Sequence, residues 1–181
     1  MIRLTIILFL LIVANASAQK LPYTNQTEAG LLLGEGIKPS FSIQTFNGVK
    51  INNGKLEAGL TTGLDVYQPA TILPVMAGLK YRLFKVAFIQ SYLNINAGYG
   101  FWLKDREDGR EYKGGYSINP SLGLRFISNR KTRLNFSVGY KEQKASVLQN
   151  PQIQNDFPGQ GWISTDEFTF KRISLTTGFS F

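Results

Sequence analysis

The sequence predicts an all-β protein in which eight antiparallel strands, connected up and down, close into a barrel that spans a membrane. Three observations predict it: an export signal at the N-terminus, a period-two alternation of apolar and polar residues over most of the remaining chain, and an aromatic C-terminal strand. In the last eleven residues, large apolar side chains alternate with small or charged ones up to Phe179 and Phe181. Soluble domains usually fray at their last residues, so this ending favours a strand held in a membrane wall.

The first residues have the organisation of a cleaved signal peptide. Arg3 supplies a positive start, residues 4–13 form an unbroken apolar run, and Ala16-Ser17-Ala18 provides a site for signal peptidase. The run is about half the length that a transmembrane helix requires. We therefore expect residues 1–18 to be a signal peptide and residues 19–181 to form one barrel domain.

Eight strands are expected, and their connections differ in length. The strands are predicted near residues 27–33, 40–51, 55–67, 71–84, 86–103, 115–128, 131–144 and 167–181. Short breaks follow the second, fourth and sixth strands, whereas long loops, 104–114 and 145–166, follow the fifth and seventh. With the N-terminus in the periplasm, both long loops lie outside the cell, which is the arrangement of transmembrane barrels.

Glycine distinguishes the two faces of these strands. Leu56, Ala58 and Leu60 alternate with Glu57 and other polar residues, and the later strands repeat this pattern. Ten glycines fall on the polar face: Gly30, Gly48, Gly59, Gly63, Gly78, Gly98, Gly100, Gly123, Gly139 and Gly178. An eight-stranded barrel has a bore that side chains fill, so large inward groups need glycine opposite them. The polar face is therefore predicted to line the lumen and the apolar face to contact lipid.

Charged residues on the polar face suggest an ion-paired lumen. The ion-pair candidates are Glu57, Asp65, Arg82, Arg125, Arg133 and Arg172, and Glu28, Lys50, Lys80 and Lys141 share their face. Such charges could form an anion-selective path, but the narrow bore of eight strands favours a plug. Each buried carboxylate then needs a basic partner.

Composition argues against enzymatic and cofactor chemistry. The chain has no histidine and no cysteine, so the usual general base, metal ligands and nucleophile arrangements are missing. Acidic residues between positions 104 and 113 do not have the spacing of a calcium loop. The basic residues behind the net charge of +8 are scattered along the chain. This distribution indicates contact with anionic lipid or internal ion pairing and not a nucleic-acid partner. We expect a non-enzymatic protein with no cofactor or metal.

Aromatic residues predict where the barrel meets its surroundings. Two girdles are expected, an outer one of Tyr99, Phe101, Tyr116 and Tyr140 and an inner one of Tyr81, Phe126 and Phe181. In the loop 145–166, Phe157 and Trp162 are candidates for binding a partner or for packing on the barrel rim.

Four stretches of the mature chain, residues 27–34, 56–67, 119–126 and 175–181, resemble the small, porin-like outer-membrane β-barrel proteins common in Bacteroidota. The resemblance implies a location in the bacterial outer membrane and contact with its lipid. It also implies that the barrel-assembly machinery reads Phe179 and Phe181 as a C-terminal signal. It assigns no activity, so we expect a scaffold or binding protein that uses loops 104–114 and 145–166 on an unknown partner. The alternatives are a soluble calycin-like barrel that binds a small hydrophobic ligand, and a small-solute pore.

Two features depart from an ideal barrel. Pro74 and Pro120 lie inside predicted strands, where each removes a hydrogen-bond donor, so a bulge or a frayed rim is expected. Phe168 and Phe170 share the parity of the lumen-facing Arg172. We expect this part of the last strand either to bulge or, preferably, to lie above the membrane.

Deletion of Phe181 should impair assembly far more than Phe181→Tyr, because tyrosine keeps an aromatic ring at the periplasmic girdle. The measurement is the amount of folded, heat-modifiable protein in the outer-membrane fraction. Normal assembly of the truncated chain would show that the last strand is not read as proposed.

Overall fold

The computed structural model describes residues 22–34, 39–67, 70–103, 110–127, 132–149 and 164–181, and these residues form one antiparallel β-sheet. Its strands are β1 (Tyr23–Gly34), β2 (Ser40–Ile51), β3 (Leu56–Val66), β4 (Thr71–Val86), β5 (Ile89–Trp102), β6 (Arg110–Lys113), β7 (Gly115–Phe126), β8 (Arg133–Gln149) and β9 (Ser164–Ser180).

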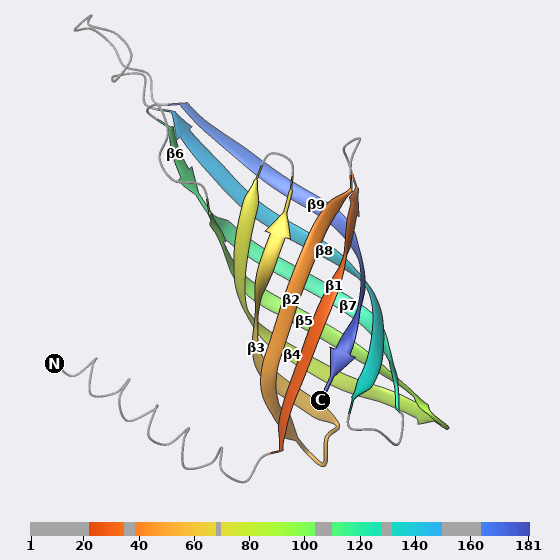
Figure 1. The fold of residues 1–181 in the computed structure, drawn as a ribbon. Helices are drawn as coiled ribbons and strands as arrows, with labels where there is room; N and C mark the ends of the chain where they lie inside the picture. Colours follow the sequence, from red (N-terminus) through yellow and green to blue (C-terminus); the bar gives the residue numbers. More distant parts are fainter. Residues whose placement is uncertain (1–21, 35–38, 68–69, 104–109, 128–131, 150–163) are drawn as a thin grey trace, which may run out of the picture.

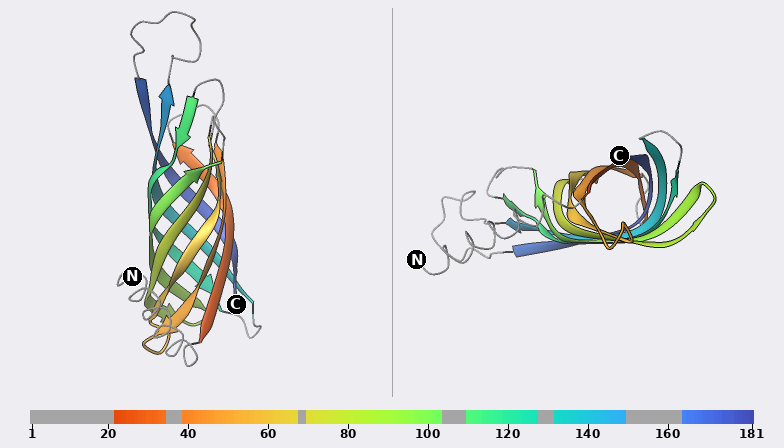
Figure 2. Two further views of the ribbon diagram at one scale, coloured as in Figure 1. Left: turned by 90° about the vertical axis from the view of Figure 1, so that its left-hand side faces the viewer. Right: turned by 90° about the horizontal axis from the view of Figure 1, so that it is seen from below.

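The sheet closes on itself. The strands follow one another from β1 to β9, β9 pairs with both β8 and β1, and eight strands therefore form a complete ring (Figure 1). The ninth strand, β6, is short and pairs with the upper part of β8, in line with β7. The view along the barrel shows the closed ring, and the side view shows β8 and β9 rising above it (Figure 2). The fold class predicted from the sequence is confirmed.

The register fixes the tilt of the strands. Starting at Gln26, hydrogen-bonded partners lead through Phe46, Thr61, Met76, Gly98, Ser117 and Gln143 to Phe170. Gln26 itself pairs with Ser180, ten residues further along β9 than Phe170. A stagger of ten residues around eight strands corresponds to a tilt of about 40° and to a narrow barrel.

The strand boundaries differ from the expected ones in four places. β1 begins at Tyr23, before the expected residue 27, and β6 lies within the predicted loop 104–114. β8 and β9 extend into the predicted loop 145–166. The turn after β4 falls at residues 87–88 and not at Lys85, because Leu83 and Phe84 form a bulge opposite Ser91 that lengthens both strands.

Short connections are found at both ends of the barrel and not only at the periplasmic end, as was expected. The end of the barrel that carries the C-terminus and the β2–β3 and β4–β5 turns is the periplasmic end in the expected orientation (Figure 1). At the opposite, extracellular end the β3–β4 connection is also short, and the Tyr67 N–H donates to the Ala70 carbonyl at 2.7 Å. Only the long connections therefore distinguish the two ends.

Pro74 and Pro120 cause no bulge. Pairing between β3 and β4 stops at Thr62 and resumes at Asp65 in the same register, and pairing between β7 and β8 is interrupted in the same way between Ile118 and Ser121. Both prolines remain paired with β5 on their other side, Pro74 with Gly100 and Pro120 with Ile95. The missing N–H therefore faces one neighbouring strand and costs only a local gap in the ladder.

The polarity of the wall is that of a membrane protein. Large apolar side chains such as Leu60, Leu122 and Val138 are 56 to 61% exposed on the outside, while charged and amide side chains are buried inside. A soluble barrel that binds an apolar ligand would show the opposite polarity. The calycin-like alternative is therefore wrong.

Glycines on the inner face make room for large side chains. A Cβ on Gly123 would lie 2.2 Å from the ring of Tyr92, and one on Gly78 would lie 3.0 Å from the ring of Phe46. Both aromatic side chains are 3% exposed. The glycine pattern thus marks the places where the bore is too narrow for two side chains.

Candidate functional site

The lumen nearest the periplasm is filled by an ion pair. Arg125 donates to both carboxylate oxygens of Glu57, at 2.8 and 3.2 Å, and the two side chains are 3% and 5% exposed. The same guanidinium donates to Gln26 Oε1 at 3.0 Å and to Asn135 Oδ1 at 3.1 Å. All three nitrogens of the Arg125 guanidinium therefore donate hydrogen bonds, which hold the group in one orientation across the bore.

Aromatic rings and a lysine complete this layer. The ammonium group of Lys80 lies 4.1 Å from the centre of the Phe46 ring and 6.0 Å from that of Tyr92. The Tyr92 hydroxyl accepts a hydrogen bond from Gln26 at 3.1 Å and donates to Glu28 at 3.5 Å. A desolvated ammonium group over an aromatic face is stabilised by the ring quadrupole. Lys80 therefore occupies the bore beside these rings, and no carboxylate among the described residues forms an ion pair with it.

Small polar side chains fill the middle of the barrel. Ser137 and Thr176 share a hydrogen bond of 2.6 Å, Thr61 donates to Asn96 at 2.8 Å, and Asn94 donates to Ser121 at 3.0 Å. The cavity among these and neighbouring residues has a volume of only about 10 Å³. Such a cavity holds about one water molecule.

A second ion pair lies closer to the extracellular end. Lys141 donates to Asp65 Oδ2, and both side chains are fully buried. Asp65 Oδ1 accepts from Ser42 at 2.6 Å and from Gln44 at 3.2 Å. Arg172, which is 9% exposed, stands beside Lys141 on the neighbouring strand.

Above this pair the lumen becomes apolar. The cluster, here called the mouth cluster, consists of Leu32, Tyr67, Ala70, Ile72, Ala145 and Phe170, with Trp102 and Phe168 packed against it. The Tyr67 and Phe170 rings stack with centroids 4.5 Å apart. Trp102 lies between Phe168, at 6.3 Å, and Tyr112 of β6, at 5.1 Å. Aromatic side chains from β5, β6 and β9 thus meet at the extracellular mouth.

The structure separates the predicted ion-pair residues into three groups. It brings Glu57 together with Arg125, and it pairs Asp65 with Lys141. Arg172 lies in the upper layer, whereas Arg82 and Arg133 are half-buried and form no ion pair with another described residue.

The predicted aromatic sites have different outcomes. Phe179 and Phe181 lie on the lipid-facing row and are 53% and 58% exposed. Phe157 and Trp162 lie outside the described residues. Phe168 and Phe170 require no bulge, because β9 keeps one register with β8 from Ser164 to Ser180. Their inward parity is real, and the sequence reasoning missed that it builds the mouth cluster.

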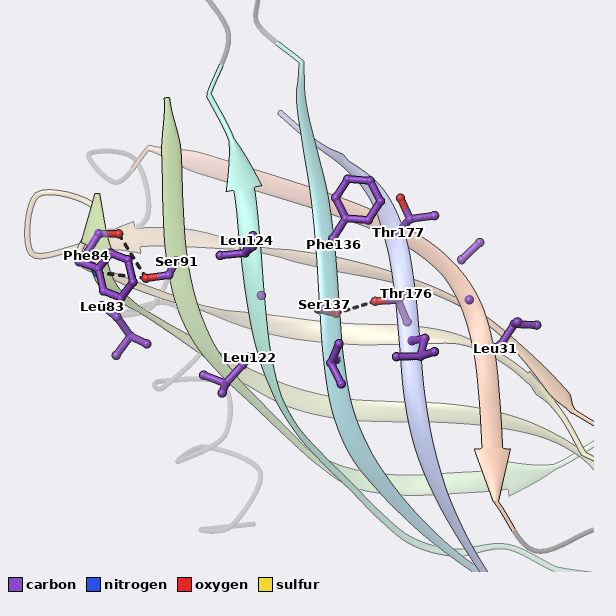
Figure 3. A pocket seen from close by; sticks show the side chains of 15 residues that line it. Leu31, Leu83, Phe84, Ser91, Leu122, Leu124, Phe136, Ser137, Thr176 and Thr177 are labelled. Atoms are coloured by element: carbon purple, nitrogen blue, oxygen red, sulfur yellow. Dashed lines mark hydrogen bonds between the residues drawn. The ribbon is translucent and has the colours of Figure 1, made fainter. Parts of the chain in front are cut away.

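The outer wall carries an apolar groove of about 730 Å³ between β1, the lower parts of β7–β9 and the β4 bulge (Figure 3). Leu31, Leu122 and Phe136 line it, and Leu83 and Phe84 close one side. Ser91 bonds to the Phe84 backbone at 3.4 Å, which holds the bulge in place. Because Leu31, Leu122 and Phe136 belong to the lipid-facing rows, the groove opens towards the acyl chains of a bilayer and not towards the lumen.

Two structural features are absent from the described part of the chain. It contains no cluster of three or more side chains able to hold a metal ion. Among the same residues, no helix is long and apolar enough to cross a membrane.

Comparisons with solved structures identify the architecture. The outer-membrane protein AlkL, solved by solid-state NMR in DMPC bilayers, matches with a TM-score of 0.52 and 14% identity over 89% of both chains. The outer-membrane protein OprG from Pseudomonas aeruginosa matches with a TM-score of 0.50 and 14% identity over 88% of this chain and 94% of that one. No protein-family model matches. No curated protein matches by sequence either.

The fold is therefore that of small outer-membrane β-barrels. Its apolar outer belt can be stable only in a bilayer, and all of its wall strands are paired, as a membrane span requires. Fold and belt together are those of a membrane-spanning β-barrel of the outer-membrane type.

Glu57→Ala should lower the free energy of unfolding by about 3–5 kcal/mol, because it leaves Arg125 buried without its counter-charge. Urea unfolding in lipid vesicles measures the change. The matched control is Glu111→Ala, which removes a half-exposed partner 3.8 Å from Lys113 and should cost under about 1 kcal/mol. Equal losses for the two variants would contradict a plug held by the Glu57–Arg125 pair.

Proposed function

We propose that this protein is a non-enzymatic outer-membrane binding protein whose closed barrel is an anchor and whose extracellular mouth receives the partner. The observation that carries the proposal is the mouth cluster, which lies above the filled lumen and continues onto strands that rise beyond the barrel.

The filled lumen supports the anchoring role. Two buried ion pairs and a layer of hydrogen-bonded small side chains lie between the mouth cluster and the periplasm. The cavity of about 10 Å³ in the middle layer and the narrow bore of eight strands both support a lumen closed by side chains. A solute that reached the mouth would meet three packed layers in succession, which argues against a small-solute pore.

The mouth cluster supports the binding role. Trp102, Tyr112 and Phe168 are only partly buried and come from three different strands. Large aromatic side chains that are held rigidly and remain accessible are the typical anchors of binding surfaces. They lie close to both predicted binding loops: β5 ends at Trp102 just before loop 104–114, β6 lies within that loop, and β8 and β9 extend into loop 145–166. The best-fitting partner is a polypeptide segment with exposed apolar or aromatic side chains.

Purified protein should show no stable ohmic conductance in planar bilayers, because the lumen side chains block ion flow. Reproducible open channels from the wild-type chain would contradict the anchor and would favour the small-solute pore.

Aromatic peptides should bind the mouth in a way that depends on Phe168. A peptide library is selected on protein in nanodiscs, and the enriched peptides are titrated by calorimetry against wild type and Phe168→Ala. Affinity should fall at least tenfold in the variant, which corresponds to the loss of one anchoring ring.

The matched control is Thr169→Ala, the neighbouring position on the exposed outer face of β9, which should leave affinity unchanged. Peptides without aromatic residues, or equal affinities for the two variants, would refute the mouth as the binding site. Trp102→Phe tests the same cluster with a ring retained, and affinity should fall less than in Phe168→Ala.

A further inference from the structure

The lipid-facing wall contains a continuous polar area, here called the wall patch. It consists of Asn25, Thr27, Thr45, Asn47, Thr62 and Thr177, which lie on the adjacent strands β9, β1, β2 and β3. All six alternate with buried inward residues, so their side chains point away from the lumen. None of them is charged.

The wall patch begins at the periplasmic edge of the apolar belt, beside Phe181, and extends into the belt. Asn25 exchanges backbone hydrogen bonds with Phe181, the last residue of the chain, and Thr27 pairs with Phe179. With strands tilted by about 40°, Asn47, Thr27 and Thr45 stand roughly 5–10 Å above Phe181 along the barrel axis. Phe181 belongs to the periplasmic aromatic girdle, so these side chains lie at the depth of lipid acyl chains.

The opposite wall shows what this depth normally contains. At the same height on β4, β5, β7 and β8 stand Leu79, Leu93, Leu122 and Phe136, which are 44 to 58% exposed. Amide and hydroxyl side chains at this depth are therefore confined to one side of the barrel. Their confinement to this side indicates that the wall here has surroundings other than lipid.

Hydrogen bonds within the wall patch satisfy only part of its polar atoms. Asn47 Oδ1 accepts from Tyr23 at 2.6 Å and from Asn25 Nδ2 at 2.8 Å, and Asn25 Nδ2 also donates to Thr45 at 3.2 Å. Among the described residues, neither Asn47 Nδ2 nor Asn25 Oδ1 has a partner. A polar group without a partner in hydrocarbon is unfavourable, because no water is present to replace the bond.

We propose that the wall patch is the contact surface between two copies of this protein in the membrane. The unused donor of Asn47 and the unused acceptor of Asn25 are adjacent, so a two-fold axis between them pairs each donor with the acceptor of the other copy. The patch is uncharged, which makes two identical surfaces compatible without repulsion. Its threonines and asparagines are small enough for the two walls to approach closely.

Cross-linking through single cysteines tests the contact, since the chain has no cysteine of its own. Leu60 pairs with Asn47 across β2 and β3 and is 61% exposed, so Leu60→Cys places a thiol at the edge of the patch. In outer membranes treated with a short bismaleimide, this variant should give a cross-linked dimer. Leu122→Cys, 58% exposed at the same depth on the opposite wall, should remain monomeric.

A second pair of substitutions identifies the interaction. Asn25→Leu with Asn47→Leu, made in the Leu60→Cys background, should reduce the cross-linked fraction more than tenfold. The heat-modifiable folded band should persist, because leucine is compatible with lipid. Persistent dimers in this variant, equal cross-linking of the two cysteine positions, or an adduct with a different protein would each overturn the proposal.

Discussion

The narrow bore imposes the constraint on which the rest of the interior depends. Eight strands with a stagger of ten residues enclose a space that side chains must fill without room to spare. A large inward side chain is tolerated only where the facing wall is reduced to backbone, which is why the Tyr92 ring lies against Gly123 and the Phe46 ring against Gly78. The same narrowness leaves little room for water in the lumen. Inward polar groups are therefore stabilised mainly by one another, as the two ion pairs and the amide and hydroxyl layer between them show.

This constraint explains how much of the barrel could be predicted from the sequence. Alternation of side chains is a local property of each strand, so the lumen-facing and lipid-facing rows follow from parity once strands are recognised. Which lumen-facing charges form ion pairs with one another is not a local property. Glu57 and Arg125 are 68 positions apart, and Asp65 and Lys141 are 76 apart. Which charges meet is set by the stagger that accumulates around the ring, and no single strand records it. For that reason the sequence places Lys141 on the lumen-facing row but does not identify it as the partner of Asp65.

At the extracellular end, side-chain parity was predicted correctly but its consequence was not. Phe168 and Phe170 have lumen parity in the sequence, yet a purely polar lumen left them without a place. The structure resolves the conflict by changing the character of the lumen along its axis, from ionic near the periplasm to apolar at the mouth. On the outside the change runs the other way: Ile173 and Tyr140 are apolar and exposed, whereas their successors towards the cell exterior, Lys171 and Glu142, are charged. Where the wall leaves the bilayer, its outer face becomes hydrophilic and its inner face supplies the apolar core. The upper strands therefore have the polarity of a soluble sheet and the lower strands that of a membrane wall.

The same reasoning distinguishes two kinds of polar side chain on the outer wall, those that the local fold covers and those that remain exposed. Ser91 is outward but covered, because the bulge at Leu83 and Phe84 folds over it and supplies a backbone partner. Asn47 is outward and exposed, and its amide nitrogen has no partner among the described residues. A covered and bonded serine is explained by the local fold alone. An exposed asparagine at acyl-chain depth is not, because nothing in its own barrel replaces the water that the bilayer excludes. The outer wall is thus consistent with a protein surface facing lipid over most of its circumference and facing another protein across β1 and β2.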